Sequence, residues 1–266
     1  MIDVKHPLNI ITRVLPLLLP LLRVNIGTII LLFIWWAVAQ MQIIDPLLLP
    51  TPQATLVTLW TSLWQDDLLQ DFWLTLYRSL YAFGVATILG VPIGIVLGAN
   101  EQLYQSCEFL IDFFRSTPAT AVFPLFLVIF GIGDFSKVAV AAFAGGLIIF
   151  FNVAYGVINA RKTRILAAKV MGASGWRIFL DVIFFETLPQ TFVGLRTAVS
   201  LTLVVIIVAE MFIGSTNGMG QRIIDAQQTF DLTQMYASII ATGMMGYGLN
   251  QLFLLIEKKF VHWKSK

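Results

Sequence analysis

Six apolar stretches, most of them long enough to cross a lipid bilayer, follow one another along the chain and restrict its fold class. They cover residues 25–44, 73–99, 118–132, 136–158, 188–213 and 235–256. A helix needs about 20 apolar residues to span the hydrocarbon core. Only 12% of the 266 residues are charged and 58% are hydrophobic, whereas soluble domains are about 25% charged. The sequence therefore predicts an all-α, polytopic membrane protein with about six transmembrane helices.

The segments around the third stretch leave alternatives open. Residues 118–132 are short for a span and contain Pro124, so residues 103–114 form either a separate helix or the first half of this span. Residues 14–22 are too short to span and are interpreted as an interfacial lead-in, with a cleaved signal peptide as the alternative. Residues 45–71 are polar, and a short helix is expected near residues 54–64.

The distribution of Lys and Arg predicts the orientation. With both termini in the cytoplasm, most basic residues fall on the cytoplasmic side, and the outer loops hold only Lys137 and Arg222. Positive residues are retained on the cytoplasmic side of a membrane. We therefore expect an even number of spans with both termini inside.

Small residues recur at every fourth position of the second span. On a helix this spacing places them on one face, where a neighbouring helix can approach closely. The face indicates tight packing within the helix bundle, with a seam between two copies of the chain as the alternative. Its members are Ala82, Ala86, Gly90, Gly94 and Gly98.

Three ionisable residues fall within the spans: Arg78, Arg196 and Glu210. Arg196 and Glu210 are separated by about 21 Å along one helix, so they cannot pair. Arg196 lies near the inner end of its span, where its side chain can reach the interface. Arg78 and Glu210 lie at matched depth, roughly 6–7 Å below the outer surface. We hypothesise that they pair and hold the second and fifth spans together near an outer gate, because an unpaired intramembrane charge is costly. Independent snorkelling to the headgroups is the alternative.

The basic segment 160–189 is unusual for a loop between spans. Residues 165–172 have good helix sequence, residues 172–175 break it, and an amphipathic helix over 176–185 is expected to end before Pro189. An apolar helical hairpin outside the membrane predicts a cytoplasmic docking element. An interfacial hairpin without a partner is the alternative.

Several function classes are disfavoured by what the sequence lacks. A single cysteine, Cys107, allows no intrachain disulfide and no Cys-based zinc site, and the two histidines form no cluster. The net charge of +2 and the absence of a basic run with aromatics argue against nucleic acid. No Gly-Lys dipeptide occurs, so the chain has no phosphate-binding loop of the Walker type. No metal site is expected.

Segment 160–189 resembles the loop that marks the permease subunits of ATP-binding cassette importers. The matching residues are Leu166-Ala-Ala, three further residues, Gly172-Ala173, and later Leu188-Pro189; Leu166 stands where the family usually has Glu. Over residues 45–260 the chain is similar to the nitrate, sulfonate, taurine and bicarbonate group of these permeases, with a type I (MetI-like) fold. The further motifs are Leu47-Leu-Leu-Pro-Thr-Pro52, Arg115-Ser-Thr-Pro118, Phe130-Gly-Ile-Gly133, Gly194-Leu-Arg196 and Val208-Ala-Glu-Met211.

The resemblance implies a division of labour between subunits. Two permease chains, expected to be a homodimer, form the pathway in the inner membrane, an external binding protein delivers the solute, and two cytoplasmic ATPases bind ATP-Mg. This chain would hold no cofactor and would not be an enzyme. The solute is expected to be small and anionic. The ATPase would dock on residues that share the loop, Ala167, Ala168, Gly172, Ala173 and Trp176. The pathway or gate would include Ser116, Thr117, Thr120, Asn152, Arg78 and Glu210.

The predicted domain organisation follows from these elements. Residues 1–70 comprise a cytoplasmic lead-in, the first span and an outer loop. Residues 71–257 form a type I transmembrane domain of five helices with the loop at about 160–189, and residues 258–266 are a basic cytoplasmic tail. A secondary transporter or channel without an ATPase is the alternative function; it would show inverted repeats or midplane charge relays. A membrane-embedded enzyme is a further alternative, but the spans lack paired carboxylates and metal ligands.

Overall fold

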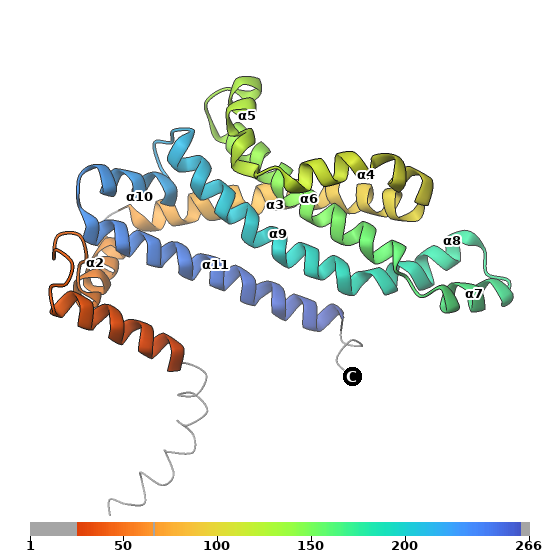
Figure 1. Cartoon of the computed structure of the whole chain (residues 1–266), viewed down its shortest axis with the longest axis horizontal. Helices are drawn as coiled ribbons and strands as arrows, with labels where there is room; N and C mark the ends of the chain where they lie inside the picture. Colours follow the sequence, from red (N-terminus) through yellow and green to blue (C-terminus); the bar gives the residue numbers. More distant parts are fainter. Residues whose placement is uncertain (1–25, 66, 262–266) are drawn as a thin grey trace, which may run out of the picture.

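The computed structural model describes residues 26–65 and 67–261, and every regular element in these ranges is helical (Figure 1). The N-terminal lead-in and most of the basic tail lie outside the described residues. The elements are the helix Ile26–Gln40, α2 (Pro52–Gln65), α3 (Leu68–Ala99), α4 (Glu101–Ser116), the 3₁₀ turn η1 (Ala119–Val122), α5 (Phe123–Phe130), α6 (Asp134–Ile158), α7 (Lys162–Val170), α8 (Gly175–Ile178), the π-helical turn η2 (Phe179–Ile183), α9 (Phe184–Phe212), α10 (Met219–Gln228) and α11 (Leu232–Phe260).

Four helical segments are long and apolar enough to cross a membrane: α3, α6, the continuous run Gly175–Phe212, and α11. A fifth crossing results if α4 and the segment Ala119–Phe130 are taken together. The shorter apolar helix Ile26–Gln40 corresponds to the first predicted span. The architecture therefore agrees with the predicted all-α membrane fold of about six helices.

The bundle has two distinct ends (Figure 1). Helices α3, α6 and α9 pack against one another, and α11 packs along α9. One end carries α2 and α10, and we call it the α10 end. The other carries α7 and α8, and we call it the α7 end.

The third predicted span is a sharply bent pair of helices. The axis of α4 and that of Ala119–Phe130 differ by 93°. Thr117 and Pro118 separate the two parts, because a residue before proline is driven out of the helical region and Thr117 is extended at φ −82°, ψ 122°. Residues 103–114 therefore lie in α4, a helix distinct from Ala119–Phe130 and joined to it by this bend, and the two together pass as one broken span or a re-entrant loop.

The expectation that a helix ends before Pro189 is wrong, because α9 continues through it. A proline inside a helix removes one backbone hydrogen bond. Close packing on α6 outweighs this cost: a Cβ atom at Gly156 of α6 would lie 2.8 Å from Thr187 Cγ2 and 3.2 Å from Gln190 Cβ. Helical structure at Pro189 is thus set by tertiary contacts that local sequence does not contain.

The small-residue face of α3 lies against α6, inside the bundle. A Cβ atom at Gly90 would lie 3.0 Å from the Gly146 carbonyl oxygen, one at Gly94 would lie 2.7 Å from that of Phe150, and one at Gly98 would lie 2.6 Å from Val157 Cβ. Ala82 and Ala86 are buried in the same interface. The arrangement favours the packing interpretation of this face over a seam between copies.

Candidate functional sites

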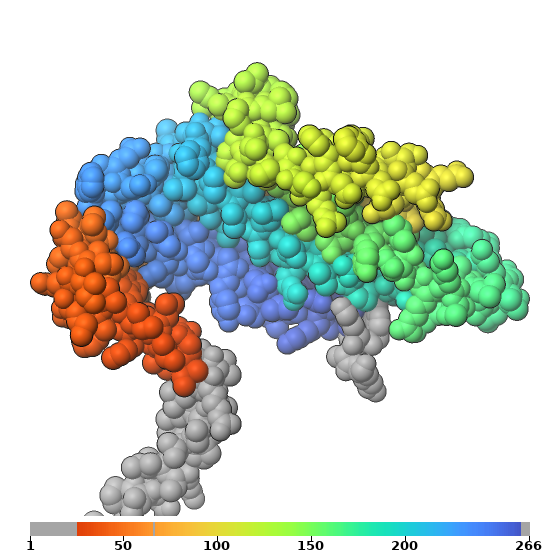
Figure 2. All heavy atoms as spheres, in the orientation of Figure 1, coloured from red at the N-terminus to blue at the C-terminus, as the bar shows by residue number. Residues whose placement is uncertain are grey.

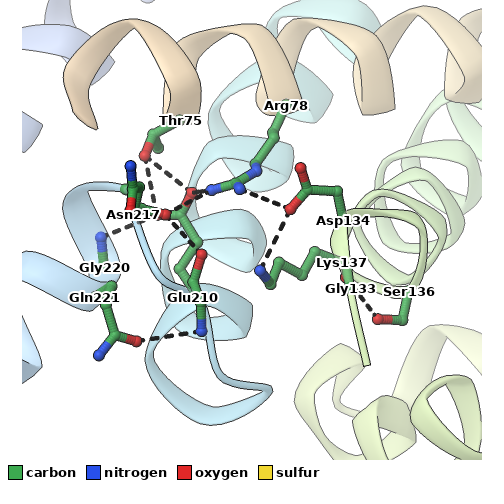
Figure 3. A network of polar contacts seen from close by, with 12 residues as sticks. Thr75, Arg78, Gly133, Asp134, Ser136, Lys137, Glu210, Asn217, Gly220 and Gln221 are labelled. Atoms are coloured by element: carbon green, nitrogen blue, oxygen red, sulfur yellow. Dashed lines mark hydrogen bonds and ion pairs between the residues drawn. The ribbon is translucent and has the colours of Figure 1, made fainter. Parts of the chain in front are cut away.

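A buried ion pair joins α3 to α9 at the α10 end (Figure 3). Arg78 Nη1 lies 2.7 Å from Glu210 Oε1, and both side chains are almost completely excluded from solvent. The two residues are 132 positions apart in sequence. The hypothesised pairing is therefore present in the structure.

The Glu210 carboxylate has partners on both oxygens. Thr75 Oγ1 lies 2.9 Å from each of them, and the Gly220 amide donates to Oε2 at 2.9 Å. The Met219 amide in turn donates to Thr75 Oγ1 at 2.8 Å. A buried carboxylate needs such partners, because leaving its charge unsatisfied would cost several kcal/mol.

Arg78 also connects this pair to α6. Its Nη2 lies 2.6 Å from Asp134 Oδ1, and its Nη1 donates to the Asn217 carbonyl at 2.9 Å. Lys137 Nζ lies 3.4 Å from the same Asp134 oxygen. The network thus contains two basic and two acidic side chains and links α3, α6, α9 and the loop before α10 (Figure 3).

The assignment of Lys137 to an outer loop is wrong: the residue lies in the first turn of α6, and its side chain is 2% exposed. Asp134 and Asp71 were not identified from sequence as members of a site. Both stand at span ends, where carboxylates are common. The i,i+3 spacing of Asp134 and Lys137 was the one available signal.

A polar cavity of about 320 Å³ opens beside the network at the α10 end. Asp71 lies at its edge, accepting from the Gly218 amide at 2.7 Å and lying 3.3 Å from Arg222 Nη1. Its other polar lining residues come from the loop before α10, from α10 and from the start of α11, among them Asn217, Gln221, Asp225 and Gln234. In the described part of the chain, no group of three His, Cys, Asp or Glu side chains is placed to hold a metal ion.

The other polar residues predicted for the pathway, apart from Arg78 and Glu210, lie in two separate places. Ser116, Thr117 and Thr120 lie at the break between α4 and η1, where Ser116 and Thr120 are exposed. Asn152 lies instead in the interface of α6 with α9, accepting from Gln190 Nε2 at 2.8 Å and donating to the Ile148 carbonyl at 2.8 Å. Its contacts are those of a packing residue within this chain.

The α7 end carries the helical hairpin predicted from segment 160–189. Helix α7 ends in a Schellman turn: the Ala173 amide donates to the Ala168 carbonyl and the Gly172 amide to that of Lys169, both at 3.0 Å. Gly172 has φ +79°, and a Cβ atom added there would meet nothing within 4 Å of this chain. The left-handed backbone conformation of this turn is therefore a sufficient reason for a glycine at position 172.

Large apolar side chains on this hairpin face solvent. Val170 and Met171 are more than 80% exposed, and Leu166 and Trp176 more than 60%. Ala167 is exposed, Ala168 and Ala173 are half-buried, and none of the nine residues of α7 is buried. Figure 2 shows the hairpin forming the tip of the molecule farthest from α10. We call Leu166, Val170, Met171 and Trp176 the hairpin patch.

Comparison with known proteins finds one family along most of the chain. Residues 90–265 match the model of the binding-protein-dependent transport system inner membrane component. The taurine transport system permease protein TauC of Escherichia coli K12 is 29% identical over 248 residues, which cover 91% of this chain and 90% of TauC. A probable ABC transporter permease of Brucella abortus is 30% identical, covering 82% of this chain and 87% of that protein.

Two further comparisons extend this finding. The nitrate import permease protein NrtB of Leptolyngbya laminosa is 29% identical over 72% of this chain and 68% of its own length. A chain from the inward-facing MetNI methionine ABC transporter superposes with a TM-score of 0.64, at 19% identity, over 73% of this chain and 95% of its own length, which shows a shared fold. With the apolar bundle and the sequence match, the chain belongs to the family of binding-protein-dependent transport system inner membrane components, and it is a multi-pass permease subunit of an ABC importer, a transport subunit rather than an enzyme.

Proposed function

We propose that this chain, as a homodimer, forms the path for a small anionic solute of the sulfonate, taurine or nitrate type, and that two separate ATPase subunits drive it. The solute class is supported by the relatives, among them a taurine permease and a nitrate permease. ATP-Mg would be bound by the partner ATPases, since the chain has no Walker-type loop.

The hairpin patch is the observation that supports an ATPase-binding interface at the α7 end. Four large apolar side chains stay exposed at one tip of the molecule: Leu166 and Val170 on α7, which buries none of its residues, Met171 just after it, and Trp176 on α8. Exposed apolar patches of this kind mark protein interfaces. The patch surrounds Ala167, Ala168, Gly172 and Ala173, which the family resemblance also assigns to docking.

The charge network lies at the opposite end, where an external binding protein would deliver the solute. Basic residues concentrate in segment 160–189 and support a cytoplasmic α7 end and an outer α10 end. This orientation places both termini in the cytoplasm. In it, Arg78 and Glu210 hold α3 to α9 beside the outer mouth and stabilise its closed state.

Reconstitution tests the proposal. The chain is assembled in proteoliposomes with candidate ATPase and binding-protein subunits from the same organism, and uptake of labelled taurine, alkanesulfonates and nitrate is measured with and without ATP inside the vesicles. ATP-dependent uptake that requires the binding protein supports the proposal. Uptake that is independent of ATP would instead support a secondary transporter or channel.

A Met171→Asp variant tests the docking surface in the same system. A charge within the hairpin patch should prevent co-purification of the ATPase, because burying it at an apolar interface is costly. Thr163→Asp, which places a charge at an exposed polar position of α7 outside the hairpin patch, is the control. Undiminished ATPase binding by Met171→Asp would place the interface elsewhere.

A further inference from the structure

Helix α7 has few connections to the rest of the molecule. None of its residues is buried, and its backbone packs mainly against α8 and the π-helical turn η2. The chain path from α7 to α9 passes through the Schellman turn at Gly172, the four residues of α8, and η2. A π-helical turn interrupts the regular hydrogen-bond ladder of an α-helix. A displacement of α7 would be absorbed along this path.

A second connection between α7 and α9 is made by Glu186. This residue lies in the first turn of α9, and its side chain is 15% exposed. Arg164 Nη1 contacts its Oε1, and Arg161 Nε lies 3.9 Å from its Oε2. One partly buried carboxylate therefore receives two arginines from the beginning of α7.

Because of the position of Glu186, these ion pairs connect α7 directly to α9. Glu186 follows η2 in sequence, so a contact from α7 to Glu186 bypasses the Schellman turn, α8 and η2 together. Within segment 160–189 only Asp181 and Glu186 are acidic, and Asp181 is exposed on η2. The neighbouring Leu166 offers no carboxylate of its own.

We infer that Glu186 is a positioning residue for coupling: it clamps the beginning of α7 to the first turn of α9, so that a movement of the hairpin is passed directly to the long helix. This inference rests on the proposed function, in which the hairpin docks on an ATPase. The clamp itself is a property of this chain and can be measured without the partner.

The first experiment measures the position of α7 relative to α9. Spin labels are placed at Lys169 and Thr197, two exposed positions, in a Cys107→Ser background of the full chain in lipid nanodiscs. Glu186→Gln should broaden the distance distribution between the labels, and so should Arg164→Gln. The double variant Arg164→Glu with Glu186→Arg exchanges the two charges and should narrow the distance distribution again. The control is Asp181→Asn, which removes the other carboxylate of the segment and should leave the distribution as in the parent. An unchanged distribution in Glu186→Gln would overturn the clamp.

The second experiment measures coupling in the assembled transporter. Glu186→Gln should lower the ratio of solute-stimulated to basal ATPase rate roughly two- to fivefold at unchanged ATPase binding, the range expected for a partly exposed ion pair. The charge exchange should recover the ratio. A ratio equal to that of the parent would overturn the role in coupling. If the parent complex itself shows no stimulation, the proposed function fails, and the distance measurement still decides the clamp.

Discussion

Gly218 lies directly against the carboxylate of Glu210. A Cβ atom at position 218 would stand 2.5 Å from Glu210 Oε1, and the residue has φ +128°, a conformation that side chains rarely adopt. The loop before α10 can therefore close over the carboxylate only because this position has no side chain. The amides of Met219 and Gly220, the first two residues of α10, then reach Thr75 and Glu210.

Removing the charge of Glu210 should destabilise the protein strongly. Glu210→Gln keeps the shape of the side chain but leaves Arg78 with Asp134 as its one acidic partner among those described, and breaking a buried pair costs about 3 kcal/mol or more. Thermal unfolding of the purified chain in detergent measures the loss. The control is Glu257→Gln, which breaks the less buried pair with Arg196 at 3.4 Å and should cost about 1 kcal/mol or less. An equal decrease of the unfolding midpoint in the two variants would contradict the larger stabilising role of the buried Arg78–Glu210 pair.

A methyl group on the small-residue face should force α3 away from α6. Gly94→Ala would bring its Cβ within 2.7 Å of both the Phe150 carbonyl oxygen and Val153 Cβ, and overpacking of this kind costs about 1–3 kcal/mol. Gly84→Ala is the matched control, since its Cβ would meet nothing within 4 Å and alanine is the better helix former. The midpoint of thermal unfolding should fall for the first and stay or rise for the second. A fall of the same size in both would show that glycine is needed on the helix for another reason.

Substitutions at Gly172 distinguish two reasons for a glycine at this position: the left-handed backbone conformation, or a close approach of the partner subunit. If φ +79° is the reason, Gly172→Asn should retain more ATPase stimulation than Gly172→Ala, because asparagine tolerates the left-handed conformation better than alanine does. We expect this order, with Gly172→Trp inactive because of its bulk beside the hairpin patch. The measurement is solute-stimulated ATPase activity at matched membrane insertion. The reverse order, alanine above asparagine, would indicate that close approach of the partner sets the requirement.

Accessibility to a membrane-impermeant thiol reagent checks the orientation. Cysteines introduced at Gln53 and Thr216, both exposed at the α10 end, should react from outside intact cells. Native Cys107, on α4, should not react from outside. Labelling of Cys107 from outside would reverse the orientation.

The sequence predicted the helices well wherever an apolar run was uninterrupted. Residues 136–158 and 235–256 correspond to α6 (Asp134–Ile158) and α11 (Leu232–Phe260), because hydropathy alone determines which segments enter lipid. The pairing of Arg78 with Glu210 could be reasoned from matched depth, since few charges within spans leave few possible partners.

Other features depend on contacts that a single sequence does not encode locally. The continuation of α9 through Pro189 is set by its packing on Gly156. The burial of Lys137 follows from where Asp134 and Arg78 meet, and residues at span ends give no sign of whether they face water or a neighbouring helix. The placement of Asn152 between α6 and α9 is likewise a tertiary result.

The uninterrupted helical run Gly175–Phe212 has 38 residues, and at 1.5 Å per residue it is about 57 Å long. The hydrocarbon core that it crosses is only about 30 Å thick. A helical run of this length is longer than the hydrocarbon core is thick, and the hairpin patch lies at its Gly175 end, with Trp176 in the run and the other three residues just before it. A change in the tilt of this run would therefore move the hairpin patch farther than any part of the run within the lipid.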